Sequence, residues 1–244
     1  MKFDKIEKLF EDNDVVVVNK PVGLVVHSDG KTKEPNLCDW ILKNYTATAQ
    51  VGEPLILKDG REINRPGIVH RLDRETSGVL IIAKNQKSFL NLKQQFKKRE
   101  VKKIYKTFVW GVMKEDEGEI DRPIGRSKKD FRLWSAQRGT RGKVREALTE
   151  YKVIQRNKDF SFLEINLKTG RTHQIRVHMK AVNHPVVGDK LYAPKRDFAL
   201  GFERVALHAF SIELVLLNGK KMKVEAPLPI DFEKALKEVR PLNG

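Results

Sequence analysis

The sequence has a single cysteine, no long apolar run and no segment typical of a secretion signal. Cys38 is the one cysteine among 244 residues, which excludes an internal disulfide and a zinc site built from cysteines. We expect it to be a small buried side chain in a protein of a reducing compartment, the cytoplasm. No apolar run approaches the roughly 20 residues of a membrane-spanning helix, so no membrane partner is expected.

Motifs for metal binding and for serine chemistry are missing as well. The six histidines do not form the pair, four residues apart with a glutamate, that zinc hydrolases use. No acidic cluster suits magnesium. Neither a glycine-rich phosphate-binding loop nor a Gly-x-Ser-x-Gly pattern occurs. We therefore predict no metal site. Of the catalytic chemistries considered, a reaction carried out by a carboxylate side chain remains.

Acidic residues are few relative to basic ones. The chain holds 48 lysines and arginines against 32 acidic residues, which gives a net charge of +16. A protein this basic usually binds a polyanion. Because the sequence offers no membrane feature, nucleic acid is the favoured partner.

The first basic stretch, 87–106, holds eight basic residues and one acidic residue. Apolar residues at helical spacing predict a helix over about 86–99 with one buried face. We expect Lys97, Lys98 and Arg99 to contact phosphates of the nucleic acid. The alternative is a solvated helix face without a partner.

The second basic stretch, 126–145, interleaves Phe131 and Trp134 with cations and predicts a flexible loop or hairpin. Its basic residues are Arg126, Lys128, Lys129, Arg132, Arg138, Arg141, Lys143 and Arg145. Aromatic rings between cations suit single-stranded or looped RNA, which binds by stacking and by charge. The alternative is an edge hairpin that its charges keep soluble.

The order of expected elements, many strands with a few helices, favours the α+β class. Alternating apolar residues predict a β-hairpin from 147–154 and 160–167. Thr172 is the expected N-cap of a following helix. The chain shows no repeat or obvious linker, so a single domain is expected, with a mostly antiparallel sheet flanked by helices.

The charged stretch 70–78, which contains Asp73, stands directly before the apolar run 79–83. This short branched run predicts a buried strand. Charges at the mouth of a buried strand are costly unless they are paired or perform chemistry. Neighbouring arginines can keep Asp73 ionised, and an ionised carboxylate can act as a nucleophile. By spacing alone, an ion pair that orders the turn explains Asp73 equally well.

Residues 70–78 resemble the signature of the RluA-type pseudouridine synthases, His-Arg-Leu-Asp-x-x-Thr-Ser-Gly. Further matches follow in the family's order, at Asn19–Gly23 with His27, Lys103–Tyr105, Gly170–His178, His184–Asp189, Leu207–Ala209 and Ala226–Pro229. The resemblance implies one catalytic domain over 1–244, with its core at 9–235. Such enzymes detach uracil from its ribose within RNA, rotate it and rejoin it through carbon, using neither a metal nor an organic cofactor.

The same resemblance implies roles for individual residues. Asp73 would be the nucleophile, attacking either the anomeric carbon of the ribose or the ring of the base. Tyr105 would stack on the base and assist proton transfer, and Arg176 would pair with the aspartate. Arg71 would enter the RNA stack in place of the flipped base. The further residues expected at the RNA or the base are His70, Thr76, Arg171, Ile175 and Val177.

Many relatives carry an additional N-terminal RNA-binding domain, and few residues precede the first matched strand here. We therefore expect this domain to be absent and the catalytic domain, as a monomer, to bind an rRNA or tRNA stem-loop by itself. Two other hypotheses about the function stay open. One is a catalytically silent RNA-binding protein of the same fold; the other is a glycosidase or nuclease, for which Glu75 would be the nearest second carboxylate.

Overall fold

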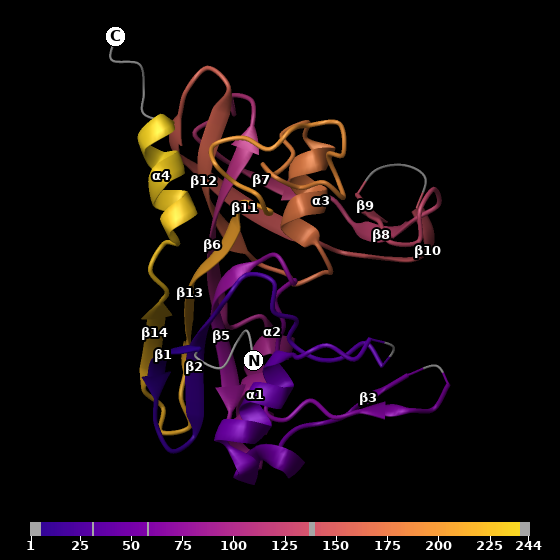
Figure 1. Ribbon diagram of the computed structural model, residues 1–244, viewed down its shortest axis with the longest axis vertical. Coiled ribbons are helices and arrows are strands. Elements are labelled where there is room, and N and C mark those ends of the chain that lie inside the picture. Colours follow the sequence, from indigo (N-terminus) through magenta and orange to yellow (C-terminus); the bar gives the residue numbers. More distant parts are fainter. Residues whose placement is uncertain (1–5, 31, 58, 137–139, 240–244) are drawn as a thin grey trace. The chain divides into compact units, whose positions relative to one another are not determined.

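The computed structural model describes residues 6–239 except 31, 58 and 137–139. The chain divides into two compact units. Unit 1 comprises Met1–Lys102 and Ala209–Pro227, and unit 2 comprises Lys103–His208 and Leu228–Gly244. Each unit combines antiparallel strands with helices (Figure 1), so the expected α+β class is confirmed.

The sheet of unit 1 has the strand order β1-β2-β5-β13-β14. Its strands are β1 (Glu7–Glu11), β2 (Val15–Lys20), β5 (Ser77–Ala83), β13 (Leu207–Val215, in this unit from Ala209) and β14 (Lys221–Glu225). Every residue of β5 is buried, as the apolar run predicts. It pairs antiparallel with β2, so that Val15 lies opposite Ala83 and Lys20 opposite Gly78.

Two α-helices complete unit 1, α1 (Leu37–Asn44) and α2 (Gln86–Lys98). The predicted helix over 86–99 is confirmed, with Phe89 and Leu92 packed into the core of the unit. Between α1 and β5, where the sequence patterns predict no regular element, the structure contains short ones. They are a 3-10 helix (Thr46–Gln50) and an arm of two paired strands, β3 (Leu55–Ile56) and β4 (Glu62–Ile63) (Figure 1).

Unit 2 has a sheet in the order β6-β12-β11-β7. The strands are β6 (Lys102–Trp110), β7 (Glu117–Asp121), β11 (Leu148–Arg156) and β12 (Phe160–Leu167), and the helices are α3 (Gln174–Ala181) and α4 (Ile230–Glu238). The predicted hairpin is confirmed, because β11 and β12 pair antiparallel from Thr149 opposite Leu167 onward. Phe232 of α4 packs against Phe108 of β6 with ring centroids 5.5 Å apart.

The start of α3 corrects the expected N-cap. His173, not Thr172, occupies the cap position, in the left-handed conformation with φ 56°. The side chain of Gln174 explains the shift, because it is buried and bonds in several directions. Its amide oxygen accepts from the Thr169 hydroxyl at 2.7 Å, and its nitrogen donates to the Leu148 carbonyl at 3.0 Å. The amide of Gln174 donates to the Arg171 carbonyl at 3.1 Å, so Thr172 lies inside a turn that is completed before the helix begins.

Within the part of the chain that the structure describes, no helix is both long and apolar enough to cross a bilayer.

Candidate active site

Asp73 lies half-buried at the start of a turn in unit 1, just before β5. The amide of Thr76 donates to the Asp73 carbonyl at 3.2 Å and closes this turn. Leu72 and Thr76, on either side, are 4% and 2% exposed. These buried neighbours fix the backbone from which the half-buried Asp73 side chain extends.

His70 anchors the other end of the same loop. Its Nε2 accepts a hydrogen bond from the amide of Ile81 at 3.0 Å. The ring also stacks on Phe96 of α2, with centroids 4.8 Å apart. These contacts join the loop to β5 and α2 and give His70 a structural role, while its expected contact with RNA stays a prediction.

Gly78 explains why the motif ends in glycine. Its φ is 111°, a conformation that side chains disfavour. A Cβ atom at this position would lie 2.1 Å from the carbonyl oxygen of Ala209 on the neighbouring strand β13. The close pairing of β5 with β13 therefore requires glycine, and this pairing sets where the loop before β5 ends.

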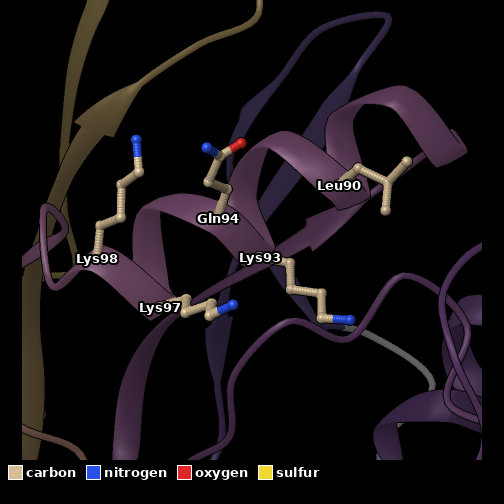
Figure 2. Close-up of a pocket in the computed structure, with 5 residues that line it drawn as sticks. All are labelled: Leu90, Lys93, Gln94, Lys97 and Lys98. Atoms are coloured by element: carbon tan, nitrogen blue, oxygen red, sulfur yellow. The ribbon is translucent and has the colours of Figure 1, made fainter.

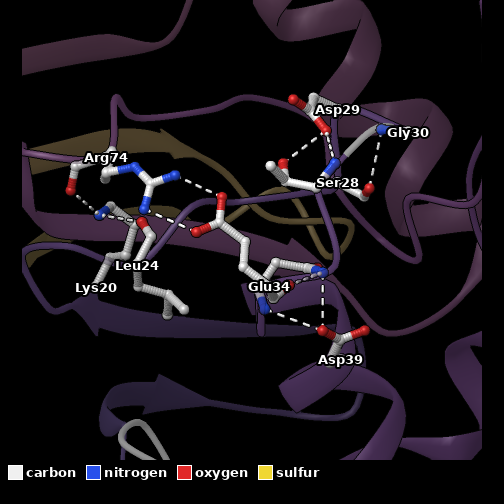
Figure 3. A network of polar contacts seen from close by, with 10 residues as sticks. Lys20, Leu24, Ser28, Asp29, Gly30, Glu34, Asp39 and Arg74 are labelled. Atoms are coloured by element: carbon white, nitrogen blue, oxygen red, sulfur yellow. Dashed lines mark hydrogen bonds and ion pairs between the residues drawn. The ribbon is translucent and has the colours of Figure 1, made fainter.

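A fully buried lysine, Lys20, stabilises the turn that contains Asp73. Lys20 is 0% exposed, and its ammonium donates to the carbonyls of Leu24 at 2.8 Å and Arg74 at 3.3 Å (Figure 3). The Arg74 carbonyl also accepts from the amide of Gly23 at 2.9 Å. Because a buried ammonium needs such partners, Lys20 holds the turn of Asp73 against the turn that follows β2.

The side chain of Arg74 reaches outward and contacts a third loop. Two guanidinium nitrogens donate to the Glu34 carboxylate at 2.8 and 2.5 Å (Figure 3). This carboxylate raises the pKa of Arg74. Glu34 stands two residues before Asn36, which caps α1 through its side chain. The loop before α1 is thereby tied to the turn that contains Asp73.

In unit 2, Arg176 is held by a buried carboxylate. Its Nε and Nη2 donate to Asp189 at 2.7 and 2.8 Å. The same carboxylate accepts from the amides of Leu191 and Tyr192 at 3.1 and 3.0 Å. The guanidinium also lies 5.0 Å from the centre of the Tyr192 ring. These contacts hold the guanidinium in one orientation, with its charge compensated by Asp189; the expected pairing of Arg176 with Asp73 stays a prediction.

The remaining expected residues of unit 2 lie near the core of that unit. Tyr105 is 8% exposed on β6 and lies opposite Ile165 of β12. Ile175 and Val177 are 4% and 3% exposed, and Val177 packs with Ile124 and other apolar side chains. Arg171 donates from Nε to the Glu146 carbonyl at 2.9 Å. None of these positions tests the base-contacting roles, which stay predictions.

The exposed face of α2 forms a shallow basic groove. Lys93, Lys97 and Lys98, together with Leu90 and Gln94, line a space of about 420 Å³ (Figure 2). Lys93 pairs with Glu53. Arg99 ends the helix in the left-handed conformation. Lys97 and Lys98 of this groove and Arg99 at the C-terminal end of α2 are the residues expected to contact phosphates. That contact stays a prediction.

The second basic stretch folds as a small sheet in unit 2. It consists of β8 (Ile124–Ser127), β9 (Trp134–Ser135) and β10 (Thr140–Arg145), in the order β10-β8-β9. Arg126 lies 4.3 Å from the centre of the Trp134 ring, and Phe131 is 71% exposed. The sequence allowed a loop or a hairpin, and strands are found; Arg138 lies outside the described residues.

The sequence did not assign roles to three residues that contact expected site residues or their loop within one unit. Lys20, His27 and Asp189 all fall within the matched motifs, so a signal was present. Their contacts with Arg74, Arg71 and Arg176 join residues 54, 44 and 13 positions apart, and spacing alone does not reveal such partners. Cys38 is buried, which raises the pKa of its thiol to about 12 and agrees with a packing role. Among the described residues, no cluster of histidine, cysteine or acidic side chains could hold a metal ion.

Comparison with known proteins identifies the protein family. The family model for RNA pseudouridylate synthase matches residues 14–181, which is more than half of the chain. The chain therefore belongs to this family of RNA-modifying enzymes.

Individual relatives agree with this assignment. An RNA pseudouridine synthase of Synechocystis sp., itself uncharacterized, is 35% identical over 96% of this chain and 69% of the relative. Ribosomal large subunit pseudouridine synthase D of Blochmanniella floridana is 36% identical over 92% of this chain and 70% of its own length. Among solved structures, human RNA pseudouridylate synthase domain containing 1 has a TM-score of 0.71 at 25% identity, covering 93% of this chain and 84% of that protein.

Proposed function

We propose that this protein converts specific uridines in an rRNA or tRNA stem-loop to pseudouridine, with Asp73 as the nucleophile. The observation that carries the proposal is the half-buried Asp73 on a turn that buried neighbours hold in place, within a chain of the RNA pseudouridylate synthase family. Both units would act together as one catalytic domain, without a metal or organic cofactor, as a cytoplasmic monomer.

Arg176 and Tyr105 have supporting roles in this proposal. Asp189 holds the Arg176 guanidinium in one orientation, and we propose that this oriented group also lies beside Asp73 and favours its ionised form. Tyr105 would stack on the uracil ring and assist removal of the proton from the new carbon bond. Ile175 and Val177 would form apolar walls for the base.

The uridine has to leave the RNA stack before it can react. Base flipping costs a few kcal/mol and is least costly in loops and irregular helices. Arg71 is exposed and belongs to the same loop as Asp73, which supports the proposal that it fills the space that the base vacates. A stem-loop is therefore the favoured substrate shape.

Two surfaces would bind the RNA. The groove on α2, extended by Arg99, offers cations for phosphates, and the small sheet of unit 2 offers arginines beside the exposed ring of Phe131. Since one relative is a synthase for the large ribosomal subunit, rRNA is the first substrate class to test.

Release of tritium from RNA labelled at carbon 5 of uridine tests the reaction directly. Bulk RNA from cells that lack the gene would supply unmodified sites. We expect Asp73→Asn to reduce release to background while RNA affinity stays within a few-fold of the wild type. The matched control is Glu75→Gln in the same turn, which should remain active. Turnover by Asp73→Asn would exclude the nucleophile role, and loss of turnover only in Glu75→Gln would favour a different carboxylate mechanism.

The RNA-binding surface is tested by the dependence of affinity on salt. Each phosphate contact that is lost lowers the slope of log affinity against log salt by about 0.7 for a single strand. Replacing Lys97, Lys98 and Arg99 together by glutamine should flatten the slope accordingly. The control replaces Lys220, Lys234 and Lys237, which are exposed elsewhere, and removes the same net charge. Equal slopes for both variants would place the contact on another surface.

A further inference from the structure

His27 of unit 1 lies beside Arg71, and the proposed mechanism gives this histidine no role. The Nη1 atom of Arg71 lies 3.3 Å from His27 Nε2. The other ring nitrogen, Nδ1, lies 2.8 Å from the carbonyl oxygen of Ser28. The imidazole therefore stands between a backbone carbonyl and a guanidinium.

These two partners determine which ring nitrogen carries the proton. A carbonyl oxygen can only accept a hydrogen bond, so Nδ1 must be the donor toward Ser28. In the neutral ring Nε2 then has a lone pair, and it accepts from the guanidinium, which can only donate. The contact with Arg71 thus requires neutral His27, protonated at Nδ1.

The charges around His27 favour the neutral form. Burial lowers the pKa of this imidazole, and the nearby guanidinium groups of Arg71 and Arg65 lower it further. The hydrogen bond to Ser28 acts in the opposite direction. Desolvation and like charge both disfavour an imidazolium, so the ring is neutral at neutral pH.

We propose that His27 is a positioning residue for Arg71: the neutral imidazole accepts a hydrogen bond from the guanidinium and directs it before RNA binds. This inference rests on the proposed function, in which Arg71 enters the RNA stack. Orienting the guanidinium in advance reduces the entropy that is lost when it enters. His27 would act through Arg71 and would not touch the reacting atoms.

Protonation of His27 would end its positioning of Arg71. An imidazolium presents N–H groups at both nitrogens, so Nε2 no longer accepts, and two positive charges then face each other. Arg71 would be released as the pH falls through the pKa of His27. The RNA-flipping step should therefore slow in acid, while phosphate contacts on other surfaces remain.

An NMR titration of His27 in the full chain tests the contact without any RNA. The ring nitrogens should report the Nδ1-protonated tautomer at neutral pH. Arg71→Ala should raise the pKa of His27, because it removes both a positive charge and a hydrogen-bond donor to the neutral ring. The control Arg74→Ala removes a nearby guanidinium that bonds to Glu34 instead and should leave the titration in place. An Nε2-protonated ring, or an unchanged pKa in Arg71→Ala, would overturn the inference.

Single-turnover tritium release from the same bulk labelled RNA tests the consequence. His27→Ala should slow turnover about tenfold, the loss expected for one hydrogen bond to a charged group, while RNA affinity stays within about twofold. His27→Gln should recover most of the rate, since its amide oxygen can accept from Arg71, and should lose the decline in acid. The control His184→Gln changes a histidine that bonds to the Trp110 carbonyl and should retain that decline.

The outcomes separate this inference from the function on which it rests. A wild type without tritium release would contradict the proposed function and leave the titration result standing. An active wild type with an unchanged rate and pH profile in His27→Ala would overturn the positioning role alone. Thermal melting of each variant identifies any loss that comes from unfolding.

Discussion

Each unit contains an arginine that donates to a carboxylate through two nitrogens, but the two pairs have different surroundings. In unit 2 the side chains of Arg176 and Asp189 are 7% and 0% exposed. In unit 1 those of Arg74 and Glu34 are 48% and 31% exposed. Both arginines bind their carboxylates through two nitrogens, but the pair in unit 2 is shielded from water and the pair in unit 1 is not.

This difference separates two uses of the same interaction. Removing Arg176 and Asp189 from water is costly, and the additional bonds from the amides of Leu191 and Tyr192 offset part of that cost. The result is a charge with one fixed position. The exposed pair of Arg74 and Glu34 contributes little stability, but it links two loops and can exchange its partners for water or phosphate.

The largest expected effect is on the buried pair. Asp189→Asn leaves the Arg176 charge without its carboxylate and should lower the free energy of unfolding by about 3–5 kcal/mol. Urea denaturation followed by circular dichroism measures this change. The control Asp197→Asn alters an exposed carboxylate of the same unit and should have almost no effect. A loss below about 1 kcal/mol for Asp189→Asn would remove the contrast between the two pairs.

A smaller effect is expected from pH, through a buried histidine of unit 2. Burial lowers the pKa of His178 below its ordinary value, so below about pH 6.5 the unfolded chain binds a proton that the folded chain does not. Stability should fall with decreasing pH, by at most about 1.4 kcal/mol per pH unit for this group. Urea unfolding between pH 7 and 5 should show a shallower decline in His178→Gln. An identical decline in both proteins would assign the acid sensitivity to other groups.

The smallest effect is expected for the exposed pair. Glu34→Gln removes the carboxylate partner of Arg74 and should change the free energy of unfolding by about 1 kcal/mol or less. The difference should shrink further in 1 M salt, where the screening length is about 3 Å. Urea unfolding at low and high salt provides the measurement. A loss comparable with that of Asp189→Asn would mean that exposure does not separate the two pairs.

Most elements of the fold could be predicted because their signals are local. The apolar run 79–83 became a buried strand, and the amphipathic segment 86–99 became α2. The cap of α3 could not be predicted, because the buried side chain of Gln174 bonds to the carbonyl of Leu148 on β11, which is distant in the chain. The arm of β3 and β4 was missed for a different reason, since two strands of two residues each carry no measurable periodicity.

The candidate site combines a motif that is continuous in the chain with contacts between distant residues. The motif around Asp73 is continuous in the chain, so the sequence could point to its carboxylate. Asp189 and His27 also lie in matched motifs, yet their partners Arg176 and Arg71 are 13 and 44 residues away. A contact across such a separation depends on how the chain folds back, which spacing does not encode.

The family, the excess of basic residues that suits RNA and the position of the proposed nucleophile along the chain could be read from the amino-acid sequence. Composition and contiguous motifs suffice for these, because they depend on residue type and order. Which charged side chains are held in place, and how firmly, depends on the folded chain. Burial and partners from distant segments set the energy of a charge, so the bidentate contact of Arg176 with Asp189, the bond from Lys20 to the Arg74 carbonyl and the contact of His27 with Arg71 are visible only after folding.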